Sequence, residues 1–131
     1  MADELEPLLS RDFDRDSLVA LRREVERRSE QEGLAGLALY RFVVAVNEIT
    51  TNAVRHGGGS GRLSLWKGPG RLRCEVTDRG GGLPAGAEQA PAPPSTAANG
   101  RGLLLARHGA SRIDVRSGAD GTSVVLEVNC P

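Results

Sequence analysis

Three polar residues spaced four apart, Glu48, Asn52 and His56, stand directly before a helix-stopping Gly57. Residues four apart lie on one face of a helix, so a helical segment here would carry these side chains as a polar stripe. A neighbouring apolar stripe would pack the same helix into a core. That apolar stripe consists of Ala38, Phe42, Ala45, Ile49 and Ala53. The spacing predicts a helix that lines a pocket; the alternative is an amphipathic helix whose polar side faces water.

A carboxylate followed by glycines forms the second candidate for a binding site. Asp78 closes a strand-like run, and Gly80 and Gly82 follow it. Glycines allow a backbone to approach a flat ligand closely, and the aspartate can accept a hydrogen bond from an exocyclic amine. The alternative is an ordinary turn after a strand, which Asp-x-Gly also suits.

Two weaker signals follow in the second half of the chain. A predicted helix opens with Gly100, Arg101, Gly102 and Leu103, and the free N–H groups of such a helix start could receive a phosphate. Thr122 enters the last predicted strand, where its hydroxyl could reach the polar edge of a ligand. For the first signal, the alternative is an ordinary loop-to-helix connection. For Thr122, it is an ordinary strand residue.

Two helices are predicted in the first half of the chain. The first begins at a cap, either Asp14 or Asp16, and ends near Ser29. Its inward-facing residues are expected to be Leu18, Leu21 and Val25. Gly33 breaks this helix, and the second helix spans about residues 37–56.

Strands are predicted from alternating polar and apolar residues. The predicted strands are residues 62–67, 72–77, 113–116 and 123–128, and residues 1–12 form either a short strand or a frayed arm. A further helix is predicted at about residues 102–108. This order of elements predicts an α+β fold, a two-layer sandwich in which helices cover one face of a mainly antiparallel, mixed sheet.

The segment 80–100 is rich in glycine, proline and alanine and carries no regular pattern. Connections of this length are functional lids or disordered segments, and we predict a lid. A linker between domains is the alternative, but too little chain follows for a second domain. The 131 residues are therefore predicted to form one domain.

Composition excludes several functional classes. The 17 basic and 17 acidic residues balance, so charge gives no reason to expect binding to nucleic acid or an anionic membrane. The glycine-rich loop at residues 57–62 lacks the lysine of a Walker loop. Cys74 is predicted to be a small core residue, and neither histidine has a partner at metal-ligand spacing. The acidic N-terminus and the absence of a long apolar run predict a cytoplasmic protein.

Taken in order, the motifs resemble those of the GHKL ATPase/kinase superfamily over about residues 13–129. The small size and short lid are most similar to the stand-alone anti-sigma-factor serine kinases, the family of the sporulation and general-stress switch proteins. This resemblance implies the Bergerat ATP-binding fold, with ATP and Mg²⁺ as cofactors.

The resemblance also implies a role for each matching residue. Glu48 would be the general base toward a substrate hydroxyl, and Asn52 would hold Mg²⁺. His56 would support the pocket, and Arg55 is left without a role. The adenine site would consist of Asp78, Gly80, Gly82 and Thr122. The phosphate site would consist of Gly100, Arg101, Gly102 and Leu103.

The implied function is that of an ATP-dependent protein serine kinase that doubles as an anti-sigma factor. It would phosphorylate a STAS-type antagonist, would otherwise sequester a sigma factor, and would form a homodimer by family precedent. One alternative is a binding module that holds ATP without phosphotransfer, although the presence of Glu48 argues against it. The catalytic half of a histidine kinase and a gyrase- or chaperone-type machine need further segments, for which these 131 residues leave no room.

Overall fold

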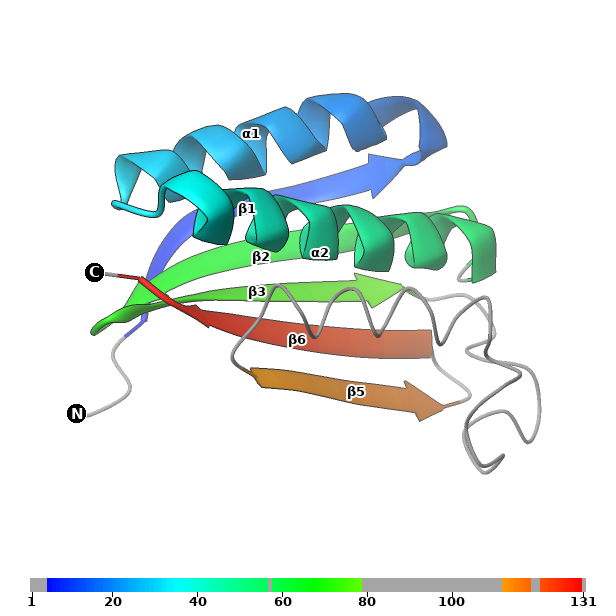
Figure 1. Cartoon of the computed structure of the whole chain (residues 1–131). Coiled ribbons are helices and arrows are strands. Elements are labelled where there is room, and N and C mark those ends of the chain that lie inside the picture. The colour runs from blue at the N-terminus through cyan, green and yellow to red at the C-terminus, as the bar shows by residue number, and fades with distance from the viewer. Residues whose placement is uncertain (1–4, 57, 79–111, 119–120, 131) are drawn as a thin grey trace.

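The computed structural model describes residues 5–56, 58–78, 112–118 and 121–130 (Figure 1). Its elements in chain order are β1 (Glu6–Asp14), a 3₁₀ turn η1 (Arg15–Ser17), α1 (Leu18–Gln31), α2 (Gly36–His56), β2 (Ser60–Gly68), β3 (Arg71–Asp78), β5 (Arg112–Gly118) and β6 (Gly121–Asn129). The predicted lid at 80–100 and the predicted helix at 102–108 lie outside the described residues.

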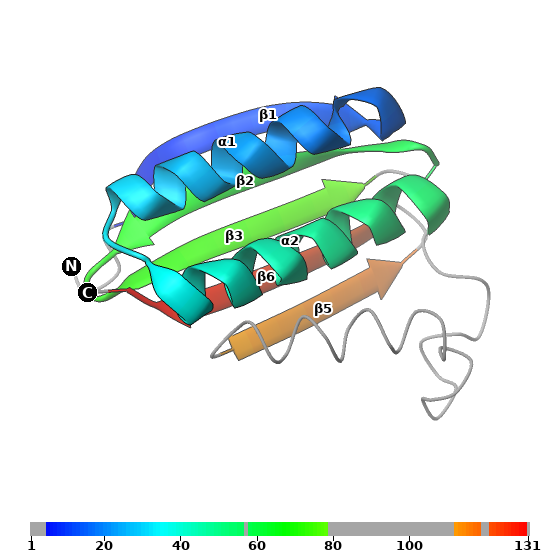
Figure 2. The same cartoon turned by 45° about the horizontal axis from the view of Figure 1, so that its top comes forward.

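The described strands form one sheet in the order β1-β2-β3-β6-β5, and each of these pairings is antiparallel. Both α1 and α2 lie on the same face of the sheet, α1 toward β1 and α2 toward β3 and β6 (Figures 1 and 2). The predicted α+β two-layer arrangement is confirmed. Neither of these helices is long and apolar enough to span a membrane.

All four predicted strands exist, and each is one or two residues longer at both ends than the sequence pattern indicated. The extra residues pair across the turns, as Gly68 does with Arg71 and Gly118 with Gly121. The frayed-arm alternative for the N-terminal segment is wrong for β1, because Leu9 and Phe13 are buried in the core.

A capping box starts the first helical segment. The Asp14 carboxylate accepts a hydrogen bond from the Ser17 N–H (3.0 Å), and the Ser17 hydroxyl oxygen accepts one from the Asp14 N–H (2.9 Å). Of the two predicted caps, Asp14 is therefore the one that caps a helical segment; it caps η1, which leads directly into α1, and the N-cap of α1 itself is Ser17. The helix ends before Gly33, whose φ of 107° lies in the left-handed region that glycine tolerates.

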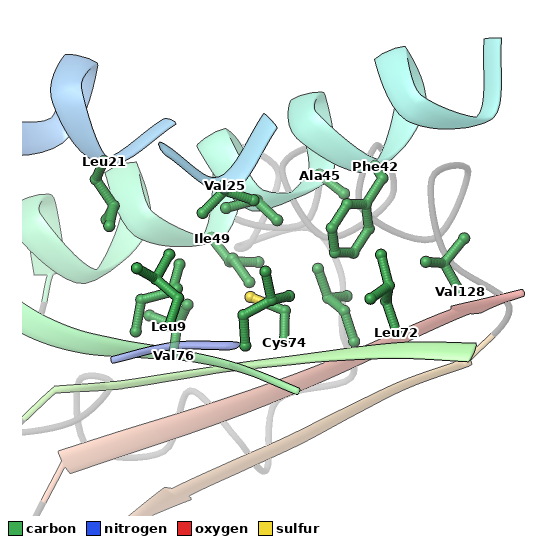
Figure 3. Close-up of a cluster of buried hydrophobic side chains, with 14 of the residues drawn as sticks. Leu9, Leu21, Val25, Phe42, Ala45, Ile49, Leu72, Cys74, Val76 and Val128 are labelled. Carbon is green, nitrogen blue, oxygen red and sulfur yellow. The ribbon is translucent and has the colours of Figure 1, made fainter. Parts of the chain in front are cut away.

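The core lies between the two helices and the sheet (Figure 3). Four members of the predicted apolar stripe are buried there, namely Phe42, Ala45, Ile49 and Ala53. The fifth, Ala38, is exposed, because Leu39 takes the core position in the first turn of α2. Cys74 is fully buried as predicted, and burial together with the neighbouring Glu75 charge raises the pKa of its thiol.

Gly61 is required by close packing where β2 pairs with β1 and β3. A Cβ atom at this position would lie 2.7 Å from both the Phe13 ring and the Thr77 carbonyl oxygen. We therefore expect Gly61→Ala to lower the free energy of unfolding by about 1–3 kcal/mol, because overpacking forces neighbouring atoms to shift. Urea unfolding followed by circular dichroism measures this change. Gly61 does not have a positive φ, so the expected loss comes from packing alone. A Gly61→Ala variant as stable as the wild type would contradict the packing explanation.

Candidate nucleotide-binding site

Four of the predicted site residues are described in the structure. Glu48 and Asn52 lie in the second half of α2, Asp78 ends β3, and Thr122 is the second residue of β6. The other predicted ligands lie outside the described residues, namely Gly80, Gly82, Gly100, Arg101, Gly102 and Leu103.

Asp78 and Thr122 are direct partners across the sheet. They are opposite each other in the β3–β6 register, and the Thr122 backbone N–H donates a hydrogen bond to Asp78 Oδ1 over 3.3 Å. Side chains alternate along a strand, and both Val76 and Val124 are buried beneath the helices. Asp78 and Thr122 therefore belong to the helix-covered face of the sheet, at its end, where both are half-buried.

Helix α2 runs in the same direction as β3 and reaches that end of the sheet. Near the start of both elements, Phe42 points toward Leu72 (Figure 3). Further along, Ile49 points toward Cys74 and Val76. The last two turns of α2 are therefore at the level of Asp78.

A hydrogen bond from α1 shows how α2 is turned about its axis. Arg22 Nη1 on α1 donates to Asn47 Oδ1 over 3.1 Å, so Asn47 marks the side of α2 that faces α1. Glu48 and Asn52 follow at about 100° and 140° around the helix from Asn47. Both side chains therefore lie on the side turned away from α1, which is the side toward β6 and β5.

Glu48 and Asn52 are half-buried at this position. Within the described part of the chain, no hydrogen bond or ion pair engages either side chain. A half-buried carboxylate and a half-buried amide that have no partner among the described residues are suited to contact a ligand. His56, the last residue of α2, is exposed.

Arg55, which the sequence pattern left without a role, lies on nearly the same side of α2 as Glu48. Arg55 follows Glu48 by seven residues, which places it within about 20° of Glu48 around the helix. Its side chain is exposed in the last turn of α2.

Asp78 also borders a pocket on the side of β1 and β2. This pocket has a volume of about 460 Å³ and is lined by Asp12, Phe13, Ser60, Gly61, Arg62, Thr77 and Asp78. The sequence pattern did not indicate it, because its walls come from three strands that meet only in the folded sheet.

The family model for the histidine kinase-like ATPase domain matches residues 12–128. The chain belongs to the histidine kinase-like ATPase family. The match includes Glu48, Asn52, Asp78 and Thr122, so the site described above lies within the ATPase domain. This result confirms the predicted GHKL superfamily.

Solved structures share the fold of this ATPase domain. The crystal structure of the RsbU and RsbW domains of Rv1364c from Mycobacterium tuberculosis is 20% identical, with a TM-score of 0.69 over 95% of this chain and 33% of that one. The histidine kinase domain of the blue-light activated EL346 from Erythrobacter litoralis is 19% identical, with a TM-score of 0.59 over 86% of this chain and 61% of that one. This chain thus spans a third of the first protein's length and less than two thirds of the second's. A comparison with curated proteins gave no match.

The ATPase family implies a nucleotide with Mg²⁺, and the residues present fit that ion. Mg²⁺ prefers oxygen ligands and is held by one or two protein groups plus substrate phosphates and water, rather than by a cage of side chains. The Asn52 amide, on the side of α2 turned away from α1, would supply such an oxygen. Among the described residues, no cluster of three or more His, Cys, Asp or Glu side chains could hold a metal ion. A site in which Asn52 shares the ion with a nucleotide would need only one protein oxygen, and so it needs no cluster of acidic side chains.

Proposed function

We propose that this protein is an ATP-dependent protein serine kinase and anti-sigma factor. It phosphorylates a serine on a STAS-type antagonist and otherwise sequesters a sigma factor. One observation carries the proposal: Glu48 and Asn52 lie on the side of α2 turned away from α1, on a helix that ends at the level of the sheet end where Asp78 is joined to Thr122. These four residues match the family motifs for general base, metal ligand and adenine site.

The chain's own residues would bind the adenine at one end of the site and promote phosphate transfer at the other. At the sheet end, the Asp78 carboxylate accepts a hydrogen bond from the exocyclic amine of adenine, and the Thr122 N–H holds that carboxylate in place. On α2, the Glu48 carboxylate would take the proton from the serine hydroxyl as the serine oxygen bonds to the γ-phosphorus, while the bond from the γ-phosphorus to the β,γ-bridging oxygen breaks and ADP leaves with its electron pair. Mg²⁺, when bound, neutralises the phosphate charge that develops in this transfer.

The exposed Arg55 side chain is a further candidate for contact with the nucleotide. A guanidinium on the same side of α2 as Asn52 is suited to a phosphate group, because it is permanently charged and offers several N–H donors. We assign it a supporting contact to the phosphates. The order of motifs supports the anti-sigma kinase over other members of the ATPase family, and a structure that includes an RsbW domain shares the fold.

A binding module is the second candidate function. In that case the same pocket would hold ATP, partner capture would be the whole activity, and phosphotransfer would be lost. Glu48 has no partner among the described residues and lies on the side of α2 turned away from α1, which favours the kinase.

Transfer of labelled phosphate separates the two functions. The purified protein is incubated with Mg²⁺ and ATP labelled at the γ-phosphate, together with STAS-domain proteins encoded beside its gene. The kinase proposal expects label on a serine of one STAS protein. Normal binding of ATP and of a sigma factor without any labelled STAS protein would support the binding module instead.

The adenine contact gives a separate prediction. We expect Asp78→Asn to weaken ATP binding about tenfold, because a hydrogen bond to a charged carboxylate becomes one to a neutral amide. GTP offers no amine at the corresponding ring position, so its weak binding should not fall further. Calorimetric titration with both nucleotides measures the difference, and an equal loss for ATP and GTP would place Asp78 outside the adenine contact.

A further inference from the structure

The second half of α2 holds a buried polar residue that the nucleotide site does not use. Thr50 is 3% exposed, and Ser29 is the other polar residue that is buried in the described part of the chain. The inner side of α2 around Thr50 is otherwise apolar, with Ile49 and Ala53 buried beside it. A hydroxyl group at such a position is costly unless it forms hydrogen bonds.

The Thr50 hydroxyl forms its hydrogen bonds within its own helix. It donates to the Val46 carbonyl oxygen over 2.9 Å and shares the proton with the Asn47 carbonyl oxygen at 3.1 Å. In an α-helix the carbonyl four residues earlier also accepts the backbone N–H, so the Val46 oxygen faces two donors. Such a bond from a threonine back to the preceding turn slightly destabilises a helix and often bends it.

These hydrogen bonds do not explain the threonine through stability. Both carbonyl groups accept backbone N–H groups in the helix, so neither would be left unpaired if the hydroxyl were absent. Valine has nearly the same shape and would bury a methyl group in place of the hydroxyl. A core position that holds threonine where valine would be at least as stabilising favours a functional explanation.

Thr50 is opposite the two site residues on the helix. Successive residues turn by about 100°, so Glu48 and Asn52, two positions before and two positions after Thr50, are each about 160° away from it. The midpoint between these two residues is therefore on the reverse side of the turn that holds Thr50. A bend centred on Thr50 would change the separation between the Glu48 carboxylate and the Asn52 amide.

We propose that Thr50 is a positioning residue for phosphate transfer, an inference that rests on the proposed kinase function. A helix becomes convex on the side where its carbonyl groups tilt outward to a second donor. The Thr50 hydroxyl thereby draws Glu48 and Asn52 toward each other on the concave side. This sets the distance between the proposed base and the proposed Mg²⁺ ligand.

Thr50→Val tests this role, because it removes the hydroxyl and keeps the branched shape of the side chain. We expect the single-turnover rate of phosphate transfer to fall by about tenfold, since small misplacements of catalytic groups have effects of this size or larger. The affinity for Mg·ATP should stay unchanged, because Asn52 keeps its amide. The free energy of unfolding should equal or exceed that of the wild type, which a residue with only a structural role would not show.

Two further variants isolate the hydroxyl. Thr50→Ser keeps it and should restore most of the rate. Ser29→Ala is the matched control, because Ser29 carries the other buried hydroxyl, lies near the end of α1 and has no hydrogen-bond partner among the described residues. Its transfer rate should equal that of the wild type. If Thr50→Val does not fold, Thr50→Ser and Thr50→Ala give the same comparison, and the serine variant should be the faster.

Two results would overturn the inference while leaving the kinase intact. Thr50→Val could transfer phosphate as fast as the wild type, which would give the hydroxyl no part in the reaction. The valine, serine and alanine variants could instead lose rate and stability equally, which would make Thr50 a packing residue only. A wild-type protein that transfers no phosphate to any STAS protein would remove the proposed function, and the role of Thr50 would fall with it.

Discussion

Glu48→Gln is expected to slow phosphate transfer to the STAS acceptor by about 10²–10⁴-fold, because that is the usual contribution of a general base. The amide keeps the size of the side chain and its capacity for hydrogen bonds, but it cannot take the serine proton. Glu48 lies on the site-facing side of α2 without a partner among the described residues, so the substitution breaks no described contact. Single-turnover transfer of labelled phosphate measures the effect.

Binding measurements on the same variant separate catalysis from structure. Glu48→Gln should bind ATP and the sigma factor with wild-type affinity. Glu30→Gln on α1, which removes an exposed carboxylate, is the matched control and should leave transfer unchanged. If Glu48→Gln transfers phosphate at the wild-type rate, Glu48 is not the base.

Asn52→Ala is expected to weaken Mg·ATP binding by about ten- to a hundredfold. The variant loses the amide oxygen proposed to hold the ion, and contacts to charged groups contribute about 1.5–3 kcal/mol. Calorimetric titration in the presence of Mg²⁺ measures the loss. Without Mg²⁺, the variant and the wild type should bind ATP almost equally.

Asn47→Ala is the matched control for this prediction. Asn47 is a second half-buried asparagine on the same helix, but it faces α1 and accepts its hydrogen bond from Arg22. Its loss should reduce stability modestly and leave Mg·ATP affinity unchanged. Equal effects of the two substitutions on Mg·ATP affinity would mean that Asn52 acts through helix packing rather than through the ion.

The hydrophobic periodicity of the sequence was sufficient to predict both described helices and four of the five described strands. Local signals such as the capping aspartate and Gly33 also located helix ends to within a few residues. These features depend on contacts between residues close in sequence. The structure therefore shows these helices and strands close to where the sequence predicts them.

The strand β1 was left ambiguous because charged residues interrupt its alternation. Arg11 lies opposite Leu63 in the sheet register, on the helix-covered face, where an apolar residue is expected. Its guanidinium instead reaches Glu24 on α1 and forms an ion pair of 2.9 Å. The sequence pattern could not show that Arg11 is on a core-facing position, because its partner Glu24 belongs to another element.

The sequence predicted single parts of the site but not how these parts lie relative to one another. The spacing of Glu48 and Asn52 placed them on one side of a helix, but nothing local indicated which side faces the sheet end. The pairing of Asp78 with Thr122 joins residues 44 positions apart and depends on the order of the strands. The family resemblance assigned both residues to the adenine site before their contact was known.

Calorimetric titration of the wild-type protein with ATP, with and without Mg²⁺, tests the central claim most directly. The account predicts saturable binding of one ATP per chain, with an affinity that rises when Mg²⁺ is present because Asn52 and the phosphates share the ion. Absence of ATP binding in both conditions, or an affinity that Mg²⁺ does not change, would contradict the assignment of this site.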